Sequence, residues 1–197
     1  MNDVVIVSPQ ELHNLIQSKL EKAGLKSEHA DEVARHLVFA DSCGIHSHGA
    51  VRVDYYAERI AKRGVTIDPN MYFEKTGPCT GVFHGDNAIG QYVANEALKY
   101  AMEMAKENGV AVVGISKLSH SGTMAYYMEK VAADNLIGLS VCQSDPMVVP
   151  FGGREPYYGT NPIGFGAPAS EGDAIVFDMA TSVQAWGRIL DARSKNL

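Results

Sequence analysis

The sequence predicts an α/β fold with a helical layer at its N-terminus. Amphipathic helical patterns fill the first 64 residues. From about residue 82 to residue 190, short apolar runs typical of strands alternate with helical patterns. Such alternation by itself favours a parallel sheet covered by helices.

The helical layer is expected to contain three helices. The first begins at a capping box in residues 8–11 (SPQE), and Gly24 ends it. Ser27 is expected to cap the second helix, which runs to about Cys43. A third helix is expected from about 49 to 64. The apolar residues expected on the buried faces of the first two helices are Leu12, Leu15, Ile16, Leu20, Ala30, Val33, Ala34, Leu37 and Val38.

Strands and helices are expected to alternate beyond residue 64. Segment 65–78 is predicted to be extended or irregular, and a short strand at 82–83 to precede a turn at 85–87. Asn87 is expected to cap a long helix that ends just before Gly109. The other expected elements are buried strands at 110–115 and 136–142, a strand at 174–177, and helices at 123–134 and from about 183.

Segment 143–168 combines turn-forming residues with apolar ones. It holds five of the chain's 8 prolines together with five glycines, so it cannot be a regular helix. It also contains eight large apolar residues, which is unlike a disordered linker. We expect a rigid, partly buried loop system that shapes a ligand pocket. The alternative is a hairpin region with tight turns.

The bulk composition excludes several classes of protein. A net charge of −6 argues against nucleic-acid binding, which needs a basic surface. The sequence has no run of eighteen apolar residues, so no membrane span is expected, and its N-terminus does not resemble a signal peptide. Cys43, Cys79 and Cys142 are widely spaced, which fits a reducing cytoplasm better than a disulfide or zinc framework.

His48, Arg52 and Tyr56 follow one another at intervals of four residues. On a helix this spacing would place them on one face. An arginine can bind a carboxylate through two hydrogen bonds, a histidine can move a proton near neutral pH, and a tyrosine can orient an oxygen. The three together suit a small hydroxy or keto acid. The alternative is a solvated polar face with a half-buried tyrosine.

His120 lies in the short segment 119–122 (SHSG), between an expected strand and an expected helix. Loops at the carboxyl ends of strands commonly carry functional groups in α/β proteins. The small neighbours would leave the imidazole accessible. The alternative is a surface histidine that bonds to the loop backbone.

Two other kinds of site are not supported by the sequence. Histidines 46, 48, 84 and 120 lack the spacing of a metal site, and there is no HExxH motif, so no metal is expected. Residues 164–169 (GFGAPA) match a dinucleotide fingerprint only as a string. That fingerprint requires a helix at its second glycine, which Pro168 and the following turn residues prevent.

Four stretches resemble a known family of enzymes: GIHSHGAVRVDYYAERI, GISKLSHSG, CQSDPMVVPFGGREPYYGTNPIGFGAP and FDMATSVQAWGRILDARS. They resemble the malate/L-lactate/ureidoglycolate dehydrogenases, NAD(P)-dependent oxidoreductases with a non-Rossmann fold. The resemblance implies an N-terminal helical region at 1–68 and an NAD-binding α/β domain from 69 to 197, with a mixed or largely antiparallel sheet. Family members are longer, so this domain is expected to be incomplete at the C-terminus.

The resemblance also implies roles for individual residues. His120 matches the proton acceptor, and His48 matches a histidine with an acid–base role in other members. Arg52 and Tyr56 match substrate-binding positions. The positions that match cofactor contacts are Ser144, Thr160, Asp178, Met179 and Ala180.

The reaction implied by the resemblance is hydride transfer from a small 2-hydroxy acid to NAD, with NADP left open. The motifs are most similar to members that oxidise ureidoglycolate to oxalurate in allantoin degradation, a branch of purine catabolism. A malate- or L-lactate-type dehydrogenase and an inactive fragment that acts only by association are the alternatives. A cytoplasmic homo-oligomer, most simply a homodimer, is expected.

Overall fold

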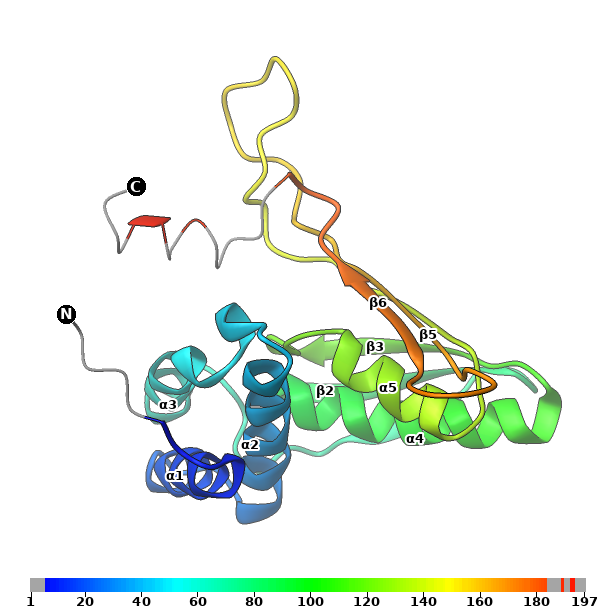
Figure 1. The fold of residues 1–197 in the computed structure, drawn as a ribbon, viewed down its shortest axis with the longest axis horizontal. Coiled ribbons are helices and arrows are strands. Elements are labelled where there is room, and N and C mark those ends of the chain that lie inside the picture. The colour runs from blue at the N-terminus through cyan, green and yellow to red at the C-terminus, as the bar shows by residue number, and fades with distance from the viewer. Residues whose placement is uncertain (1–5, 184–188, 190–191, 194–197) are drawn as a thin grey trace. The chain divides into compact units, whose positions relative to one another are not determined.

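The computed structural model describes residues 6–183, 189, 192 and 193. The chain forms two compact units, Met1–Gly122 and Thr123–Leu197, and each is described here by itself (Figure 1). This division differs from the expected helical region 1–68 and cofactor domain 69–197. The expected boundary between residues 68 and 69 remains a prediction about where the cofactor-binding part of the chain begins.

The first unit begins with two helices, α1 (Pro9–Lys22) and α2 (Ser27–Ser42). The predicted capping box at Ser8 is present, and Gly24 ends α1 with φ 110°. Two predictions about these helices are wrong. Ser27 is the first residue of α2 rather than its cap, and its hydroxyl donates to Glu21. Leu15 is 64% exposed, because it lies on the outer side of α1.

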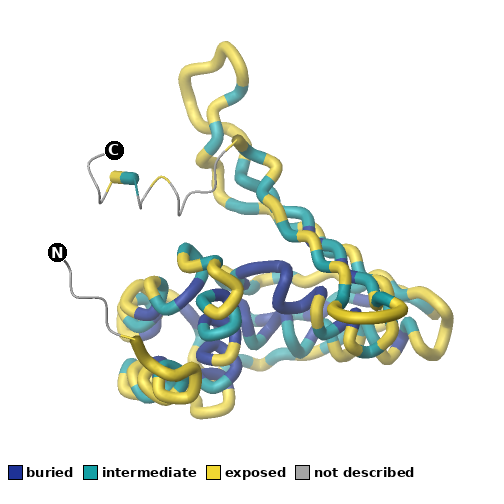
Figure 2. Tube along the Cα trace, in the orientation of Figure 1, coloured by how far each residue is buried: buried dark blue, intermediate teal, exposed yellow. Residues whose placement is uncertain are grey.

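The remaining apolar positions of α1 and α2 form a core with α3 (Val53–Ala61). In Figure 2 this core is the dark blue part of the helical region. Tyr56 belongs to it with only 2% of its surface exposed. Burying a large side chain of this kind stabilises a fold by about 1.5–3 kcal/mol. The other fully packed members are Ile16, Leu20, Leu25, Ala30, Val33, Ala34, Leu37, Val53, Ile60, Val65 and Ile89.

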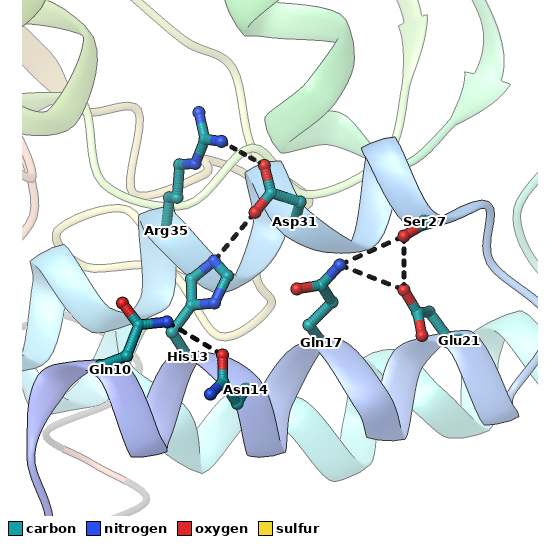
Figure 3. A network of polar contacts seen from close by, with 8 residues as sticks. All are labelled: Gln10, His13, Asn14, Gln17, Glu21, Ser27, Asp31 and Arg35. Carbon is teal, nitrogen blue, oxygen red and sulfur yellow. Dashed lines mark hydrogen bonds and ion pairs between the residues drawn. The ribbon is translucent and has the colours of Figure 1, made fainter.

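Polar contacts between α1 and α2 border this core (Figure 3). His13 Nε2 lies 3.0 Å from an oxygen of Asp31, which also pairs with Arg35. Farther along, Gln17 donates to Glu21 and to Ser27. These contacts fix the position of α1 on α2, although each exposed pair contributes at most about 1 kcal/mol.

The predicted third helix at 49–64 is interrupted. Two short 3₁₀ turns, η1 (His46–His48) and η2 (Ala50–Arg52), precede α3. Gly49 is extended between them with ψ −150°, so the two turns do not continue into one another. Asp41 holds this bend, because its carboxylate accepts a hydrogen bond of 2.7 Å from the amide of Ala50. An added Cβ on Gly49 would overlap that carboxylate, which explains the glycine.

The first unit also contains a three-stranded sheet in the order β1 (Tyr72–Lys75), β2 (Thr80–Ala88), β3 (Val112–Leu118). The β1–β2 pair is antiparallel and the β2–β3 pair is parallel. Helix α4 (Gly90–Asn108) packs against β2 and β3. The predicted parallel arrangement therefore holds for one strand pair of this sheet.

Three sequence expectations in this sheet need correction. The turn expected at 85–87 lies inside β2, where Asp86 and Asn87 have positive φ and the register with β3 shifts. Asn87 therefore does not cap α4, which begins at Gly90 after Ile89. The strand at 110–115 is not buried, since Val112 is 65% exposed. Gly109 ends α4 with φ 81°, as predicted.

The second unit contains α5 (Ala125–Ala133) and an antiparallel sheet in the order β4 (Gly138–Val141), β5 (Ile163–Ala167), β6 (Ile175–Met179). Glycines of β5 let α5 approach one face closely, and an added Cβ on Gly164 would lie 2.6 Å from Met124 Cβ. The opposite face carries Leu139, which is 73% exposed. The strand expected at 136–142 is therefore present but not buried. The expectation of a mixed, largely antiparallel α/β fold is confirmed.

Segment 143–168 is less buried than expected. Its end forms strand β5, and residues 151–158 are exposed throughout. An isolated antiparallel bridge joins Val148 to Tyr158, which is the feature of the hairpin alternative. Gly164 and Gly166 lie in β5, so residues 164–169 do not form a strand-to-helix phosphate loop, as the sequence indicated.

Within the described part of the chain, no helix is long and apolar enough to cross a membrane. Among the same residues, no group of three or more His, Cys, Asp or Glu side chains could hold a metal ion. Most of the helix expected from about Val183 falls on residues 184–188, 190–191 and 194–197, which lie outside the described ones.

Candidate active site

The loop that carries His120 is attached to the start of α4. The amide of Gly90 donates to the Ser119 hydroxyl at 2.9 Å, and the amide of Ser119 donates to the carbonyl of Ala88 at 3.2 Å. A side chain on Gly90 would overlap the carbonyl oxygens of Ser119 and His120. The glycine therefore allows the helix to begin directly against the backbone of the loop.

Gly122 fixes the other end of this loop. It has φ +83°, a region that residues with a side chain rarely adopt. An added Cβ would also overlap the imidazole of His36, which is completely buried in α2. Close packing thus requires a glycine at position 122, two residues after His120.

The ring of His120 is held by two buried side chains. His120 Nδ1 lies 2.7 Å from the hydroxyl oxygen of Tyr56. The same oxygen accepts a hydrogen bond of 2.9 Å from Gln91 Nε2. Tyr56 is 2% exposed and Gln91 is fully buried, whereas His120 keeps an exposed side. One edge of the imidazole is therefore anchored in the core, and the other is open to a ligand.

His48 and Arg52 lie beside this group. The rings of His48 and His120 are stacked with centroids 5.6 Å apart. Arg52 Nε donates to the carbonyl of Ser47 at 2.7 Å, and the Ser47 hydroxyl lies 3.0 Å from His48 Nδ1. The structure thus brings His48 and Tyr56 to His120, although they do not share one regular helix.

The alternative interpretations made from the sequence do not fit this geometry. Tyr56 is buried rather than half-exposed on a solvated face. His120 bonds to a side chain rather than to its own loop backbone. The spacing argument was wrong in detail because Gly49 interrupts the helix before Arg52.

The surroundings determine the charge states of the two central groups. Burial of the inner side of the ring, followed by the positive charges of His48, Arg52 and Arg59, lowers the pKa of His120 to about 3. Burial raises the pKa of Tyr56 to about 12, against smaller opposing effects from Gln91 and Arg52. At neutral pH both groups are uncharged, and His120 has a lone pair to accept a proton.

The expected cofactor-binding residues gather at one end of the sheet in the second unit. Val141, Ile163 and Met179 lie side by side in register on β4, β5 and β6. Residues that follow β4, precede β5 or end β6 therefore meet at this edge. They include Ser144, Thr160, Asp178, Met179 and Ala180.

Hydrogen bonds join several of these residues. The Ser144 hydroxyl accepts from the amide of Thr160 at 2.8 Å and lies 3.1 Å from its hydroxyl. The amide of Thr181 donates to the carbonyl of Thr160 at 2.9 Å, which joins the end of β6 to the same place. Asp178 has a structural partner as well, because its carboxylate accepts from Thr123 and from the amide of Ala125 at the start of α5.

Sequence reasoning missed three residues of these clusters. Gln91 could have been found only from the contact between α4 and α3, which no local pattern encodes. Asn161 accepts from the amide of Ser144 at 3.1 Å with φ 37°, and the Asn-Pro pair is a turn signal that could have indicated it. Gly159 has no room for a side chain against the Ser144 backbone.

A small cavity beside Thr160 tests whether these residues suit a nicotinamide dinucleotide. It has a volume of about 250 Å³. Its lining is mostly apolar and consists of Met147, Val148, Val149, Thr160, Ser182, Val183 and Ile189. Such a cavity suits a single flat ring, with hydroxyl and amide groups at its edge. The residues present therefore fit part of a nicotinamide dinucleotide.

Comparison with known proteins identifies the family. Residues 7–197 match the family model described as malate/L-lactate dehydrogenase. The chain belongs to the malate/L-lactate dehydrogenase family. This agrees with the resemblance found in its motifs and with the observed mixed α/β fold.

Relatives within the malate/L-lactate dehydrogenase family include enzymes with different substrates. A ureidoglycolate dehydrogenase (NAD(+)) of Escherichia coli O157:H7 is 57% identical over 191 residues, which are 97% of this chain and 55% of the relative. A malate/(S)-sulfolactate dehydrogenase of Methanothermus fervidus is 36% identical over 98% of this chain and 56% of the relative. The chain spans about half the length of the curated relatives it matches.

Solved structures give the same relationship. The malate dehydrogenase of Pyrococcus horikoshii OT3 matches with a TM-score of 0.90 and 36% identity. The match covers 94% of this chain and 53% of that one.

Proposed function

We propose that this chain carries the proton-accepting and substrate-binding part of an NAD-dependent dehydrogenase for 2-hydroxy acids, with ureidoglycolate as substrate and oxalurate as product. The observation that supports this most strongly is a neutral His120, anchored to buried Tyr56 and open on its other side, beside Arg52. The 57% identity to a ureidoglycolate dehydrogenase (NAD(+)) supports the choice of substrate and cofactor.

Arg52 holds the carboxylate of the substrate. Its Nε donates to the carbonyl of Ser47, which fixes the plane of the guanidinium group. The two terminal nitrogens then face the carboxylate and bind it through two parallel hydrogen bonds. This contact sets the position of the neighbouring carbon and its hydroxyl group.

His120 accepts the proton of that hydroxyl group. In its neutral state at physiological pH one ring nitrogen has a lone pair, and the contact with Tyr56 fixes the direction of the ring. His48, stacked on His120, is the second acid–base group. Tyr56 was expected to contact the substrate; because its hydroxyl is buried between Gln91 and His120, we propose that it acts through His120.

NAD, when bound, accepts the hydride from the substrate carbon. Thr160 and Ser144 would hold the nicotinamide end, since Thr160 lines the small cavity and Ser144 fixes Thr160. The end of β6, with Asp178, Met179 and Ala180, would contribute the edge of this site. NADP, which the sequence left open, is the alternative cofactor for this site.

A turnover assay tests the proposal. The purified chain would be mixed with NAD or NADP and with ureidoglycolate, malate or L-lactate, and the reduced cofactor measured by its absorbance. We expect turnover with NAD and the highest kcat/KM with ureidoglycolate. Faster turnover of malate or L-lactate would replace the substrate assignment, and turnover of none of the three acids would refute the proposed activity.

We further propose that the enzyme belongs to allantoin degradation and works in the cytoplasm as a homodimer. The cysteines at 43, 79 and 142, all in the described part of the chain, form no disulfide, which supports a reducing compartment. Light scattering at micromolar concentration tests the dimer, and a monomer would contradict it. Cell fractionation tests the compartment.

A further inference from the structure

Gln91 lies at the inner end of the chain of hydrogen bonds that reaches His120. It is the second residue of α4 and is fully buried. Its Nε2 donates to the Tyr56 hydroxyl, while its Oε1 is buried without a hydrogen-bond partner. A buried carbonyl oxygen without a partner is unfavourable because it has lost its hydrogen bonds to water, so an amide at this position indicates a role for it.

The direction of these hydrogen bonds determines which nitrogen of His120 carries the proton. Tyr56 accepts from Gln91 Nε2, so its single hydroxyl hydrogen is directed at His120 Nδ1, 2.7 Å away. Nδ1 is then an acceptor. In a neutral imidazole, the hydrogen must therefore be on Nε2, which leaves no lone pair at that atom.

Proton uptake at Nε2 requires the opposite direction. Before Nε2 can accept the hydroxyl proton of a substrate, its own hydrogen must leave to water on the exposed side of the ring, and Nδ1 must take up a proton from water in exchange. The hydrogen then carried by Nδ1 needs an acceptor. The Tyr56 oxygen can accept it only if its own hydrogen turns elsewhere. The Gln91 amide already bonds to this hydroxyl, and it can accept that hydrogen after its Oε1 and Nε2 have exchanged places.

We propose that Gln91 is a positioning residue that sets the tautomer of His120, and that its amide turns to present Oε1 to Tyr56 when the hydrogen of the ring changes from Nε2 to Nδ1, which frees Nε2 to accept the substrate proton. This inference rests on the proposed function. The turn needs little repacking because the two ends of an amide have nearly the same size. It gives Oε1 a donor and directs Nδ1–H of His120 toward Tyr56.

The charges around the ring make this support necessary. His48, Arg52 and Arg59 all disfavour a positive charge on His120. A chain from His120 Nδ1–H through Tyr56 to Gln91 Oε1 spreads that charge into the buried amide. Tyr56 itself remains protonated because burial raises its pKa to about 12.

Two substitutions of Gln91 distinguish the two possible directions of the hydrogen bonds from Gln91 through Tyr56 to His120. Gln91→Glu presents only acceptor oxygens, so Tyr56 must donate to it, and His120 should change to the Nδ1–H tautomer with a raised pKa. Gln91→Met has a similar length but no polar atom, so His120 should show a mixture of tautomers. Gln10→Glu and Gln10→Met on the exposed part of α1 are the matched controls, and they should leave His120 unchanged.

The measurement is the ¹⁵N NMR spectrum of the His120 ring in the full chain, together with kcat and KM. We expect Nε2–H in the wild-type protein, Nδ1–H in Gln91→Glu, and about a tenfold lower kcat with little change of KM in Gln91→Met. The same tautomer in all three proteins would overturn the inference. A change of tautomer without turnover of any hydroxy acid in any protein would support the positioning role and refute the proposed function.

A further variant covers the case that Gln91→Glu does not fold. Tyr56→Phe keeps the buried ring and removes the hydroxyl group that links Gln91 to His120. The His120 nitrogens should then lose the Nε2–H preference seen in the wild-type protein. An unchanged His120 spectrum in Tyr56→Phe would overturn the inference independently of Gln91→Glu.

Discussion

The two polar clusters of this chain use similar residues in different surroundings. In the first unit, the His120 loop packs against buried side chains, and Tyr56 and Gln91 beneath it are almost fully buried. In the second unit, Ser144 and Thr160 bond mainly to each other and to neighbouring loop backbone, next to a segment whose residues 151–158 are exposed.

The difference shows which cluster is specified by packing. Around His120, Gly90 and Gly122 have a defined steric reason, and the neutral state of His120 follows from burial and from nearby positive charges. Around Thr160, the sheet register brings the residues together, but the cavity beside them accommodates only a ring-sized group. We therefore expect substitutions in the first cluster to affect chemistry and folding most, and those in the second to affect mainly cofactor binding.

The largest effect is expected for His120→Ala. Removing the proton acceptor should lower kcat by about 10²–10⁴-fold, as is typical of a general base, without weakening cofactor binding. His84→Ala is the control, because His84 pairs with Glu74 and Ser116 on the sheet. Steady-state kinetics and calorimetric titration with NAD measure the two quantities. An unchanged kcat in His120→Ala would show that His120 is not the proton acceptor.

Arg52→Lys should have the next largest effect. The charge remains but the second hydrogen bond to the carboxylate is lost, at a cost of about 1.5–3 kcal/mol, or roughly tenfold to a hundredfold in kcat/KM. Arg52→Ala should cost more. Arg35→Lys, in an exposed ion pair with Asp31, is the control. If Arg52→Ala weakens NAD binding as strongly as it lowers kcat/KM, Arg52 binds the cofactor instead of the substrate.

Gly122→Ala and Gly152→Ala compare the two units directly. Both glycines have positive φ, +83° and +76°. Only Gly122 would also place its new Cβ on a buried side chain, that of His36, whereas the space around Gly152 is open. Urea denaturation should show a loss of about 2–5 kcal/mol for Gly122→Ala and about 1–2 kcal/mol for Gly152→Ala. Equal losses would show that packing around the His120 loop is not special.

Ser144→Ala should have a smaller effect, in the second cluster. The amide of Thr160 would lose its hydrogen-bond acceptor, at a cost of about 0.5–1.5 kcal/mol. Affinity for NAD should fall, with little change in the His120 ring spectrum. Ser170→Ala, in an exposed turn after β5, is the control. An effect on the His120 spectrum equal to that of Gln91→Met would mean that the two clusters are not independent.

The smallest expected effect is on stability as a function of pH. Burial lowers the pKa values of His29 and His120 in the folded chain, so the unfolded chain binds more protons. Their contribution to stability is complete above the unfolded pKa of about 6.5 and is lost as pH falls toward the folded values. His120→Asn should weaken the loss of stability between about pH 7 and about pH 5. An unchanged slope, measured by urea denaturation, would contradict the lowered pKa.

Much of the fold could be predicted because its signals are local. The capping box at Ser8 and the left-handed glycines at 24 and 109 depend on neighbouring residues only. The expectations that failed depend on distant contacts. Gly49 interrupts a helix because of Asp41, and β4 is exposed because α5 covers only its other face.

The candidate site divides in the same way. His120, His48 and Arg52 could be named from motif and resemblance. The role of Tyr56 could not, since its burial results from packing among α1, α2 and α3. Gln91 has no local signal, because its contact with Tyr56 joins residues 35 positions apart in the chain.

The central claim is that burial of the His120 ring, with the positive charges of His48, Arg52 and Arg59 around it, keeps His120 neutral as a proton acceptor. An NMR titration of the His120 ring in the wild-type chain tests it most directly, without cofactor or substrate. The account predicts that His120 remains neutral far below the usual histidine pKa of about 6.5 and protonates only in strongly acidic solution. Protonation of His120 near or above that usual value would contradict the account.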